Sequence, residues 1–409
     1  MGGPLDGVNV WDASWVGVGP LTARYLAEYG ATVVRTESTR SVDVLRKAPP
    51  FKDGVPGLNR SQFFADYNAS KLGLGVDLST DGGRRVAARL TAWADVVVEA
   101  FTPGVMDRLG LGYDRLRAVN PSLIMLSTSM NGQTGPRRGF AGFGTVLAAM
   151  SGYCELTGWP DRDPGSPYGA YTDFIGQRFA AVAVLAALEH RDRTGEGQHI
   201  DLSQMETGLM FLAPELVDHQ LTGHVATRDG NRDRAAAPHG VFPCLPEGGR
   251  ERWVAIAVTG DDQWTALRQA LGEPAWAADP RLATLSGRKE QEDRLERALA
   301  AWTSARTVAQ VVGTLQPEVP AGPVHDARGL QSDPQVAHRG YFRPQRHPVM
   351  GMMPYEGAQA ELSLTPYRVT KAAPLLGEDN ERVLTELLGF TADEVAALAA
   401  EGAVEQVLD

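Results

Sequence analysis

The N-terminal third of the chain alternates short apolar runs with helix-like segments, and this alternation constrains the fold more than any other feature. Residues 8–11 and 31–37 are typical of buried strands, and Gly19-Pro20 between them opens a helix that runs to Tyr29. Further strands are expected at residues 74–78, 95–99, 123–126 and 199–202. Thr80 is expected to cap a helix, and single helices are expected from the strand 199–202 to about His219 and over residues 288–302. This order predicts an α/β fold, a Rossmann-like and mostly parallel sheet with helices on both faces.

A change of texture after residue 220 predicts a second domain. The 409 residues are enough for two cores, and the segment 223–238 is polar and basic with no apolar period, as in a linker that crosses between bodies. We therefore expect a large domain built from residues 1–220 and completed by 330–409. Residues 225–325 are expected to form a smaller, α-rich domain.

Charge and cysteine content exclude several classes of protein. The net charge of −11 argues against a nucleic-acid binder or a protein of acidic membrane surfaces. Two cysteines, Cys154 and Cys244, and no basic-then-apolar leader favour a reducing, cytoplasmic location. The apolar runs are too short or too interrupted to span a bilayer, and no Cys/His cluster has the spacing of a zinc site, so no metal is expected.

Asp173 lies where a Gly/Pro-rich loop meets the apolar run 174–188, which predicts a deeply buried helix. Asp is a favoured helix-capping residue, and Thr172 could serve as well, so a cap is the ordinary interpretation of this residue. A carboxylate at a helix start faces unpaired amides and the positive end of the helix dipole. We therefore expect Asp173 to be well ionised.

The first strand and helix also suggest a dinucleotide site. Gly17 and Gly19 follow a strand and open a helix, and Glu37 ends the next strand, where a ribose-binding acid would lie. The fingerprint is incomplete, however, because Thr22 occupies the position of its third glycine. Pro20 also removes an amide from the turn that would hold the pyrophosphate, so this interpretation is disfavoured.

A set of segments spread over nearly the whole chain is similar to one known family. In order they are Pro4–Asp12, Ala94–Glu99, Asp107–Gly112, Gly132–Pro136, Thr194–Gln198, Pro320–Val324 and Pro374–Glu378. Together they resemble the class III coenzyme A transferases, which include formyl-CoA and carnitine CoA-transferases, and the related α-methylacyl-CoA racemases. The resemblance implies an interlocked homodimer, with the segment 223–238 as a natural crossing strand.

For Asp173 the resemblance implies a nucleophile. In these transferases an aspartate at this place attacks an acyl-CoA thioester to give a mixed anhydride, and the released CoA then forms an aspartyl-CoA thioester. The implied substrates are an acyl-CoA and a small carboxylic acid, with no permanently bound cofactor. Ionisation serves both a cap and a nucleophile, so the two roles are compatible.

Phe143 distinguishes transfer from racemisation. The racemases pair the same aspartate with a histidine thirty positions earlier, which is the position of Phe143 here. Exchange of an α-proton needs two proton carriers, and phenylalanine cannot be one. Phe143 is expected either to pack in a core or to form a wall beside the thioester or acyl chain. His239 could replace the missing histidine, although a lone histidine near a turn is more often a hydrogen-bonded loop residue.

The resemblance also implies a set of coenzyme A contacts. They fall in the turn after the first strand, in a stretch before the Thr80 helix, after the acidic strand end, and at two arginines. The residues are Val16, Gly17, Val18, Arg40, Val76, Asp77, Leu78, Ser79, Ala100, Phe101, Thr102, Arg108 and Phe143. Several depart from the family, since Gly17 stands where others carry Gln or Arg, and Ser79 where a Lys is usual. An acyl pocket is expected to draw on Phe143, Trp159, Tyr168, Tyr171 and loops around residues 350–355.

Three functions follow from these observations. The first is transfer of CoA from an acyl-CoA to a carboxylic acid through Asp173. The second is racemisation, epimerisation or other α-proton chemistry on an acyl-CoA, which exchange of an α-deuteron without any acceptor acid would reveal. The third is a non-catalytic CoA-binding protein, which would bind CoA and transfer it to no acid.

Overall fold

The chain divides into two compact units in the computed structural model, which describes residues 2–409. The large unit holds the residues up to Cys154 together with 166–225 and 337–409, and the small unit holds 155–165 and 226–336. Two boundaries differ from those expected. Residues 155–165 cluster with the small unit because Gly230 N donates to Gly158 O and Arg228 pairs with Glu155 at 2.9 Å. The small unit also extends to residue 336 rather than ending at 325, since Arg252 pairs with Asp326.

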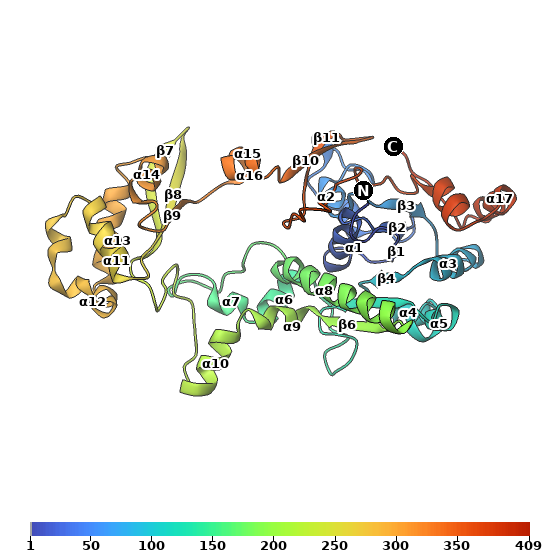
Figure 1. Cartoon of the computed structure of the whole chain (residues 1–409), viewed down its shortest axis with the longest axis horizontal. Helices are drawn as coiled ribbons and strands as arrows, with labels where there is room; N and C mark the ends of the chain where they lie inside the picture. The colour runs from blue at the N-terminus through green and yellow to red at the C-terminus, as the bar shows by residue number, and fades with distance from the viewer. Residues whose placement is uncertain (1) are drawn as a thin grey trace. The chain divides into compact units, whose positions relative to one another are not determined.

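A six-stranded parallel sheet forms the centre of the large unit, in the order β3-β2-β1-β4-β5-β6 (Figure 1). Its strands are β1 (Asn9–Asp12), β2 (Thr32–Glu37), β3 (Leu72–Gly75), β4 (Val96–Glu99), β5 (Ile124–Ser129) and β6 (His199–Ser203). Every pairing between them is parallel, so the predicted parallel α/β fold is confirmed. Strand β3 overlaps the expected 74–78 but begins earlier and ends at Gly75, where Val76 instead bridges Val404 of the C-terminal segment in antiparallel fashion.

Two layers of helices cover the sheet, and alternate residues of each strand face opposite layers. Val10, Val33 and Val96 pack in the cluster that contains α1 (Val18–Glu28) and α8 (Tyr171–Thr194). Trp11 and Val97 pack in the opposite cluster, with α3 (Asp81–Trp93), α5 (Tyr113–Val119) and α17 (Ala392–Ala400). Thr80 caps α3 as expected, its side chain accepting from Gly83 N. Near-continuous valine and leucine strands are what a sheet buried on both faces requires.

Shorter elements complete the large unit, and the helices at residues 153–156 and 334–338 each cross a boundary between the two units. They are the helical turns η1 (Val44–Lys47) and η2 (Lys52–Gly54), the helices α2 (Gln62–Asn68), α4 (Val105–Arg108), α6 (Gly144–Met150), α7 (Tyr153–Leu156), α9 (Gln204–Met210) and α10 (Ala213–Thr222), the hairpin β10 (Phe342–His347) and β11 (Gly351–Glu356), and the π-helical η5 (Arg382–Leu387). The single helix expected after β6 is two helices, with Pro214 in the first turn of the second. Helix α8 is less buried than expected, since Val182 is 66% exposed.

The small unit combines a three-stranded antiparallel sheet with helices. Its strands are β7 (His239–Glu247), β8 (Arg250–Ala257) and β9 (Ala321–Pro323), and its helical segments are α11 (Asp261–Ala270), η3 (Ala275–Ala278), η4 (Pro280–Ala283), α12 (Leu285–Glu290), α13 (Glu292–Thr303), α14 (Val308–Leu315), α15 (Ala327–Ser332) and α16 (Pro334–His338). The helix expected over 288–302 is divided between α12 and α13 at Gln291. None of the helices within residues 2–409 is long and apolar enough to cross a membrane.

Candidate active site

The strand order reverses direction between β1 and β4, and the functional loops gather at this point. From β1 the chain adds β2 and β3 on one side, and it then returns to add β4, β5 and β6 on the other. In open parallel sheets, ligands bind beyond the carboxyl ends of the strands at such a switch point. The two loops that leave β1 and β4 here are residues 13–17 and 100–104. A ligand site is therefore expected between them.

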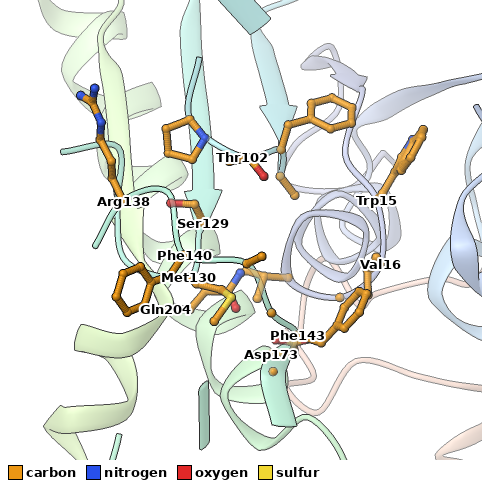
Figure 2. Close-up of a pocket in the computed structure, with 18 residues that line it drawn as sticks. Trp15, Val16, Thr102, Ser129, Met130, Arg138, Phe140, Phe143, Asp173 and Gln204 are labelled. Carbon is orange, nitrogen blue, oxygen red and sulfur yellow. The ribbon is translucent and has the colours of Figure 1, made fainter. Parts of the chain in front are cut away.

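A cavity of about 360 Å³ lies at this place (Figure 2). It is lined by Trp15, Val16, Gly17, Val18, Ala100, Phe101, Thr102, Pro103, Ser129, Met130, Arg138, Phe140, Ala141, Gly142, Phe143, Gly144, Asp173 and Gln204. A second cavity of about 400 Å³ shares Trp15 and Phe101 with it. These two rings meet edge to face at 5.4 Å and stand between the cavities. Two adjacent spaces of this size suit a long ligand better than a compact one.

Asp173 is the third residue of α8 and does not cap it. The helix begins at Tyr171, its capping position is Ala170, and no side chain makes a capping hydrogen bond. The cap interpretation of Asp173 is therefore wrong. Asp173 is 8% exposed, and within the described part of the chain its carboxylate accepts no hydrogen bond.

Two glycines press against this carboxylate. A Cβ added to Gly17 would lie 2.8 Å from Cγ of Asp173, and one added to Gly144 would lie 2.6 Å from its Oδ1. Gly17 caps α1 and Gly144 begins α6, so three helices start around one carboxyl group. This packing explains why position 17 carries no side chain.

Burial raises the pKa of Asp173 from its ordinary value of 3.8 to about 7. No neighbouring charge offsets this effect, because desolvation is its only cause. The expectation that the helix start would keep Asp173 well ionised is therefore wrong: near neutral pH about half of the molecules carry the charge. Glu99, at the end of β4, has its pKa raised to about 7 as well, mainly by burial, but it does not line the cavity.

Phe143 forms a wall of the cavity rather than part of a core. It occupies the capping position of α6, and 62% of its surface is exposed, so packing in a core is excluded. Figure 2 draws its ring close to Asp173. None of the described residues that line this cavity is a histidine. His239 belongs to β7 of the small unit, where its ring nitrogen lies 2.6 Å from Asn231 O.

The residues predicted to bind coenzyme A divide between the two cavities. The first cavity takes Val16, Gly17, Val18, Ala100, Phe101, Thr102 and Phe143. The second takes Arg40, Val76, Asp77, Leu78 and Ser79, and it shares Phe101. Arg40 lies 3.1 Å from Asp77 and is largely exposed. Arg108 lines neither cavity and lies exposed at the end of α4.

Several residues that line the Asp173 cavity were not predicted from the sequence. Ser129 ends β5, and a search of strand ends in the predicted sheet could have found it. Met130, Arg138, Phe140 and Gln204 lie in loops or at a helix start and carry no comparable signal. Of the residues expected to form the acyl pocket, Phe143 lines this cavity and the others do not: Tyr168 is 96% exposed, and Met353 and Tyr355 are buried in a separate core.

Comparison with known proteins identifies the family. The model of CoA-transferase family III matches residues 5–380. The chain belongs to CoA-transferase family III. It is therefore an enzyme, a class III CoA-transferase, and its substrates are CoA thioesters.

Several relatives of this family III enzyme are named as CoA-transferases of succinyl-CoA or succinate. The succinyl-CoA–D-citramalate CoA-transferase of Chloroflexus aurantiacus is 35% identical over 399 residues, which cover 97% of each chain. The succinate–glutarate CoA-transferase of Agrobacterium fabrum is 32% identical over 94% of this chain and 96% of its own. The crystal structure of a CAIB/BAIF family protein from Brucella suis superposes with a TM-score of 0.85 at 30% identity, covering 95% of this chain and all of that one.

Proposed function

We propose that this family III enzyme moves coenzyme A from an acyl-CoA to a carboxylic acid through covalent intermediates on Asp173. The observation that carries the proposal is the position of this carboxylate, which is unpaired, desolvated and directed at a cavity lined by the expected coenzyme A residues. A carboxylate is a nucleophile that needs no separate base once it is ionised. The pKa of about 7 gives a large ionised fraction at neutral pH together with a more basic oxygen.

The reaction balances without an added acid or base. An oxygen of Asp173 attacks the thioester carbonyl carbon, the C–S bond breaks, and a mixed anhydride and the CoA thiolate result. The thiolate attacks Cγ of Asp173, the anhydride C–O bond breaks, and the donor acid leaves as a carboxylate. The acceptor carboxylate then attacks the aspartyl-CoA thioester, and the thiolate released attacks the acceptor acyl carbon. Product acyl-CoA forms, and the Asp173 carboxylate is restored.

Each of these steps passes through a tetrahedral oxyanion, which needs hydrogen-bond donors. Ser129 lines the cavity, is 8% exposed, and its Oγ has no partner among the described residues. The amides at the start of α1 lie beside Asp173, on the side of Gly17. We assign these groups as the donors, because an unpaired buried hydroxyl is costly unless a ligand uses it.

The acceptor is proposed to be a dicarboxylic acid, as the names of the relatives suggest for those proteins. Arg138 is the one cation among the described residues that line the Asp173 cavity. Its guanidinium is turned away from Asp173 (Figure 2), so it suits a second carboxylate on the far end of a substrate. Phosphate contacts are proposed for Arg40 at the second cavity.

Racemisation is disfavoured on the same geometry. Proton exchange at an α-carbon needs a second proton carrier, and Phe143 stands where the racemases hold one.

We also propose that the enzyme is a homodimer, supported by apolar helix faces that the chain itself leaves uncovered. A cytoplasmic location stays a prediction from the two free cysteines.

Replacement of the nucleophile tests the mechanism. Asp173→Ala and Asp173→Asn are expected to lose at least about a thousandfold in exchange activity, since the covalent route is gone. The assay follows CoA esters by mass spectrometry after incubation with succinyl-CoA and a panel of mono- and dicarboxylic acids. In the parent enzyme incubated with acyl-CoA, hydroxylamine should displace CoA from the aspartyl thioester and leave a single hydroxamate on the peptide that contains Asp173.

Glu99→Gln is the matched control, because it removes a second buried carboxyl whose pKa is also about 7 but which lies outside the cavity. It should retain the hydroxylamine-sensitive adduct. Calorimetry should show that Asp173→Asn still binds CoA. Full exchange activity in Asp173→Ala would eliminate the proposal.

A further inference from the structure

The turn between β1 and α1 is held in a strained conformation beside Asp173. Val16 has φ of +66°, in the left-handed region that a β-branched residue rarely enters. Such a conformation is strained and persists only where surrounding contacts impose it. The next residue, Gly17, is the one that presses against the Asp173 carboxylate. Whatever holds Val16 therefore also sets the position of the nucleophile.

Asp43 is the side chain that holds Val16 directly. Its Oδ2 accepts a hydrogen bond from Val16 N at 3.2 Å and one from Arg35 Nη2 at 2.6 Å. Its Oδ1 accepts from Leu45 N at 2.9 Å, which caps η1 and fixes the carboxyl group itself. Asp43 is fully buried. A rigid acceptor is thus placed on the amide of the strained residue.

Arg35 holds the other end of the same turn. Its Nη1 donates to Ser14 O at 2.8 Å and lies 3.3 Å from Oδ2 of Asp12. Asp12 in turn accepts from Ser14 N at 3.0 Å and from the Ser14 hydroxyl. Both backbone groups of Ser14 are therefore bound by buried charged side chains.

Lys71 ties this network to the helix that follows the turn. Its ammonium group donates to Asp12 Oδ2 at 2.7 Å, to Asn68 Oδ1 at 2.8 Å and to Pro20 O at 2.9 Å. Pro20 lies in the first turn of α1. The three donors of the ammonium group are thus used, and the beginning of α1 is fixed relative to the end of β1.

Fold stability alone does not account for four buried charges around one turn. A buried ion pair is often no more stable than apolar residues of the same volume, because desolvation offsets the attraction. What such a network gives is fixed direction and distance. Here its hydrogen bonds converge on Ser14 and Val16, and neither Asp43 nor Arg35 lines the Asp173 cavity.

We propose that Asp43 and Arg35 are positioning residues that clamp the turn 13–17, so that Gly17 confines the Asp173 carboxylate in its attacking position. This role rests on the proposed function of Asp173. The clamp acts through the backbone of Val16, and a glycine at position 16 would adopt the same conformation without strain. The need for the clamp should therefore depend on the residue at position 16.

A double-mutant cycle tests the dependence. The kcat for CoA transfer of Asp43→Asn is compared with that of the natural enzyme. The kcat of the double variant Asp43→Asn, Val16→Gly is compared with that of Val16→Gly alone. We expect Asp43→Asn to lower kcat about tenfold to a hundredfold in the natural background, as a small misplacement of a reacting group does. In the Val16→Gly background the loss should fall to about threefold or less. Equal losses in the two backgrounds would overturn the proposal.

Two further variants distinguish loss of the clamp from general destabilisation and from failure to fold. Glu28→Gln is the matched control, because Glu28 is a buried acid paired with Arg24 at 2.7 Å on the same helix α1, and neither touches the turn. If its kcat fell as far as that of Asp43→Asn, general destabilisation would explain both and the clamp would be rejected. If Asp43→Asn does not fold, Arg35→Lys replaces it in the same cycle, since lysine keeps the charge but cannot bridge Ser14 O and Asp43 together.

Hydrogen exchange separates the clamp from the reaction. Asp43→Asn should speed amide hydrogen exchange in the peptide that contains residues 13–19. The exchange rate of the peptide around Glu28, near the end of α1, should not change. Unchanged protection of residues 13–19 would reject the clamp. This readout needs no turnover, so it stands even if Asp173→Ala shows that the covalent route is wrong.

Discussion

Asp173 combines burial with the absence of any hydrogen-bond donor to its carboxylate among the described residues. A carboxylate in such a place is destabilised before substrate arrives, and the reaction relieves this by turning it into a neutral anhydride or thioester. Its neighbours are the bare backbones of Gly17 and Gly144 rather than a cation. The residue thus differs from the buried acids of the nearby ion network, each of which has a basic partner.

The pH dependence of transfer follows from the pKa of Asp173, which burial raises to about 7. Only the ionised form attacks, so kcat/KM is expected to fall tenfold per pH unit below about pH 7. A solvated aspartate would instead lose activity near pH 4. Initial rates between pH 5 and 9 check this, with Glu99→Gln as control because the pKa of Glu99 is also about 7. A midpoint that moved with Glu99→Gln would assign the titration to Glu99.

The same shift has a consequence for folding. The pKa of Asp173 is higher in the folded chain than its ordinary 3.8, so its contribution to stability is complete below pH 3.8 and is lost as pH rises through about 7. Asp173→Asn should therefore raise the free energy of unfolding at pH 8, by at most about 4 kcal/mol. The gain should disappear toward pH 4 in denaturant titrations. A gain independent of pH would contradict this assignment.

Among the elements, the turn and helix that follow β1 do most to build the site. Helix α1 starts at Val18 and packs against α8, whose third residue is Asp173. The two helix starts are brought together only because small residues allow it: Gly17 meets Asp173, and Gly176 meets Val18. A side chain at either glycine would change the geometry of the nucleophile.

Gly17→Ala tests the contact between these two helix starts. The added Cβ would overlap the Asp173 carboxyl group, which must then turn away from its position in the cavity. We expect exchange to fall by about a hundredfold and the hydroxylamine adduct to be lost, since a small displacement of a nucleophile costs this much.

Gly313→Ala is the control for that substitution. Gly313 lies exposed in α14, and a Cβ there would meet nothing within 4 Å. It should raise stability by about 0.5–1 kcal/mol without affecting transfer. If Gly17→Ala also kept full activity, the carboxylate would not be confined as described.

At the scale of the whole molecule, the large unit leaves apolar helix faces uncovered. No residue of α10 is buried, and Leu221 on this helix is 80% exposed. On neighbouring elements Val182 is 66% exposed, Met210 62% and Phe211 56%. Several large apolar side chains exposed in this way on a protein of net charge −11 are typical of an interaction surface. A second copy of the chain is the proposed occupant.

The oligomeric state is therefore expected to be a dimer, with twice the 43.9 kDa mass of one chain in light scattering after gel filtration. Leu221→Glu combined with Val182→Glu should shift the protein toward monomer, because charges would be buried without partners. Glu215→Gln, on the same helix α10, is the control and should remain dimeric. A monomeric parent enzyme would contradict the proposal. Because one relative is named as an alpha subunit, that outcome would favour a different partner chain.

Local sequence was sufficient to predict the central sheet and several of its helices. Strand and helix periods predicted the parallel sheet, and Thr80 was recognised as a helix cap from its own neighbourhood. Most residues that the family resemblance implies as coenzyme A contacts line one of the two cavities, and their role stays a prediction. These features depend on residues close together in the chain, where pattern and conformation are directly linked.

The properties of Asp173 itself were decided only by tertiary structure. Its place in the third position of α8, its raised pKa and its confinement follow from Gly17 and Gly144, which are distant in sequence. Tertiary structure also decided the role proposed for Asp43 and Arg35, whose hydrogen bonds reach the turn that follows a different strand, β1. Desolvation depends on every atom that displaces water, and these atoms come from three helix starts. The sequence thus determined which residue is placed at the site, and the packing of separate elements determined its protonation and its direction.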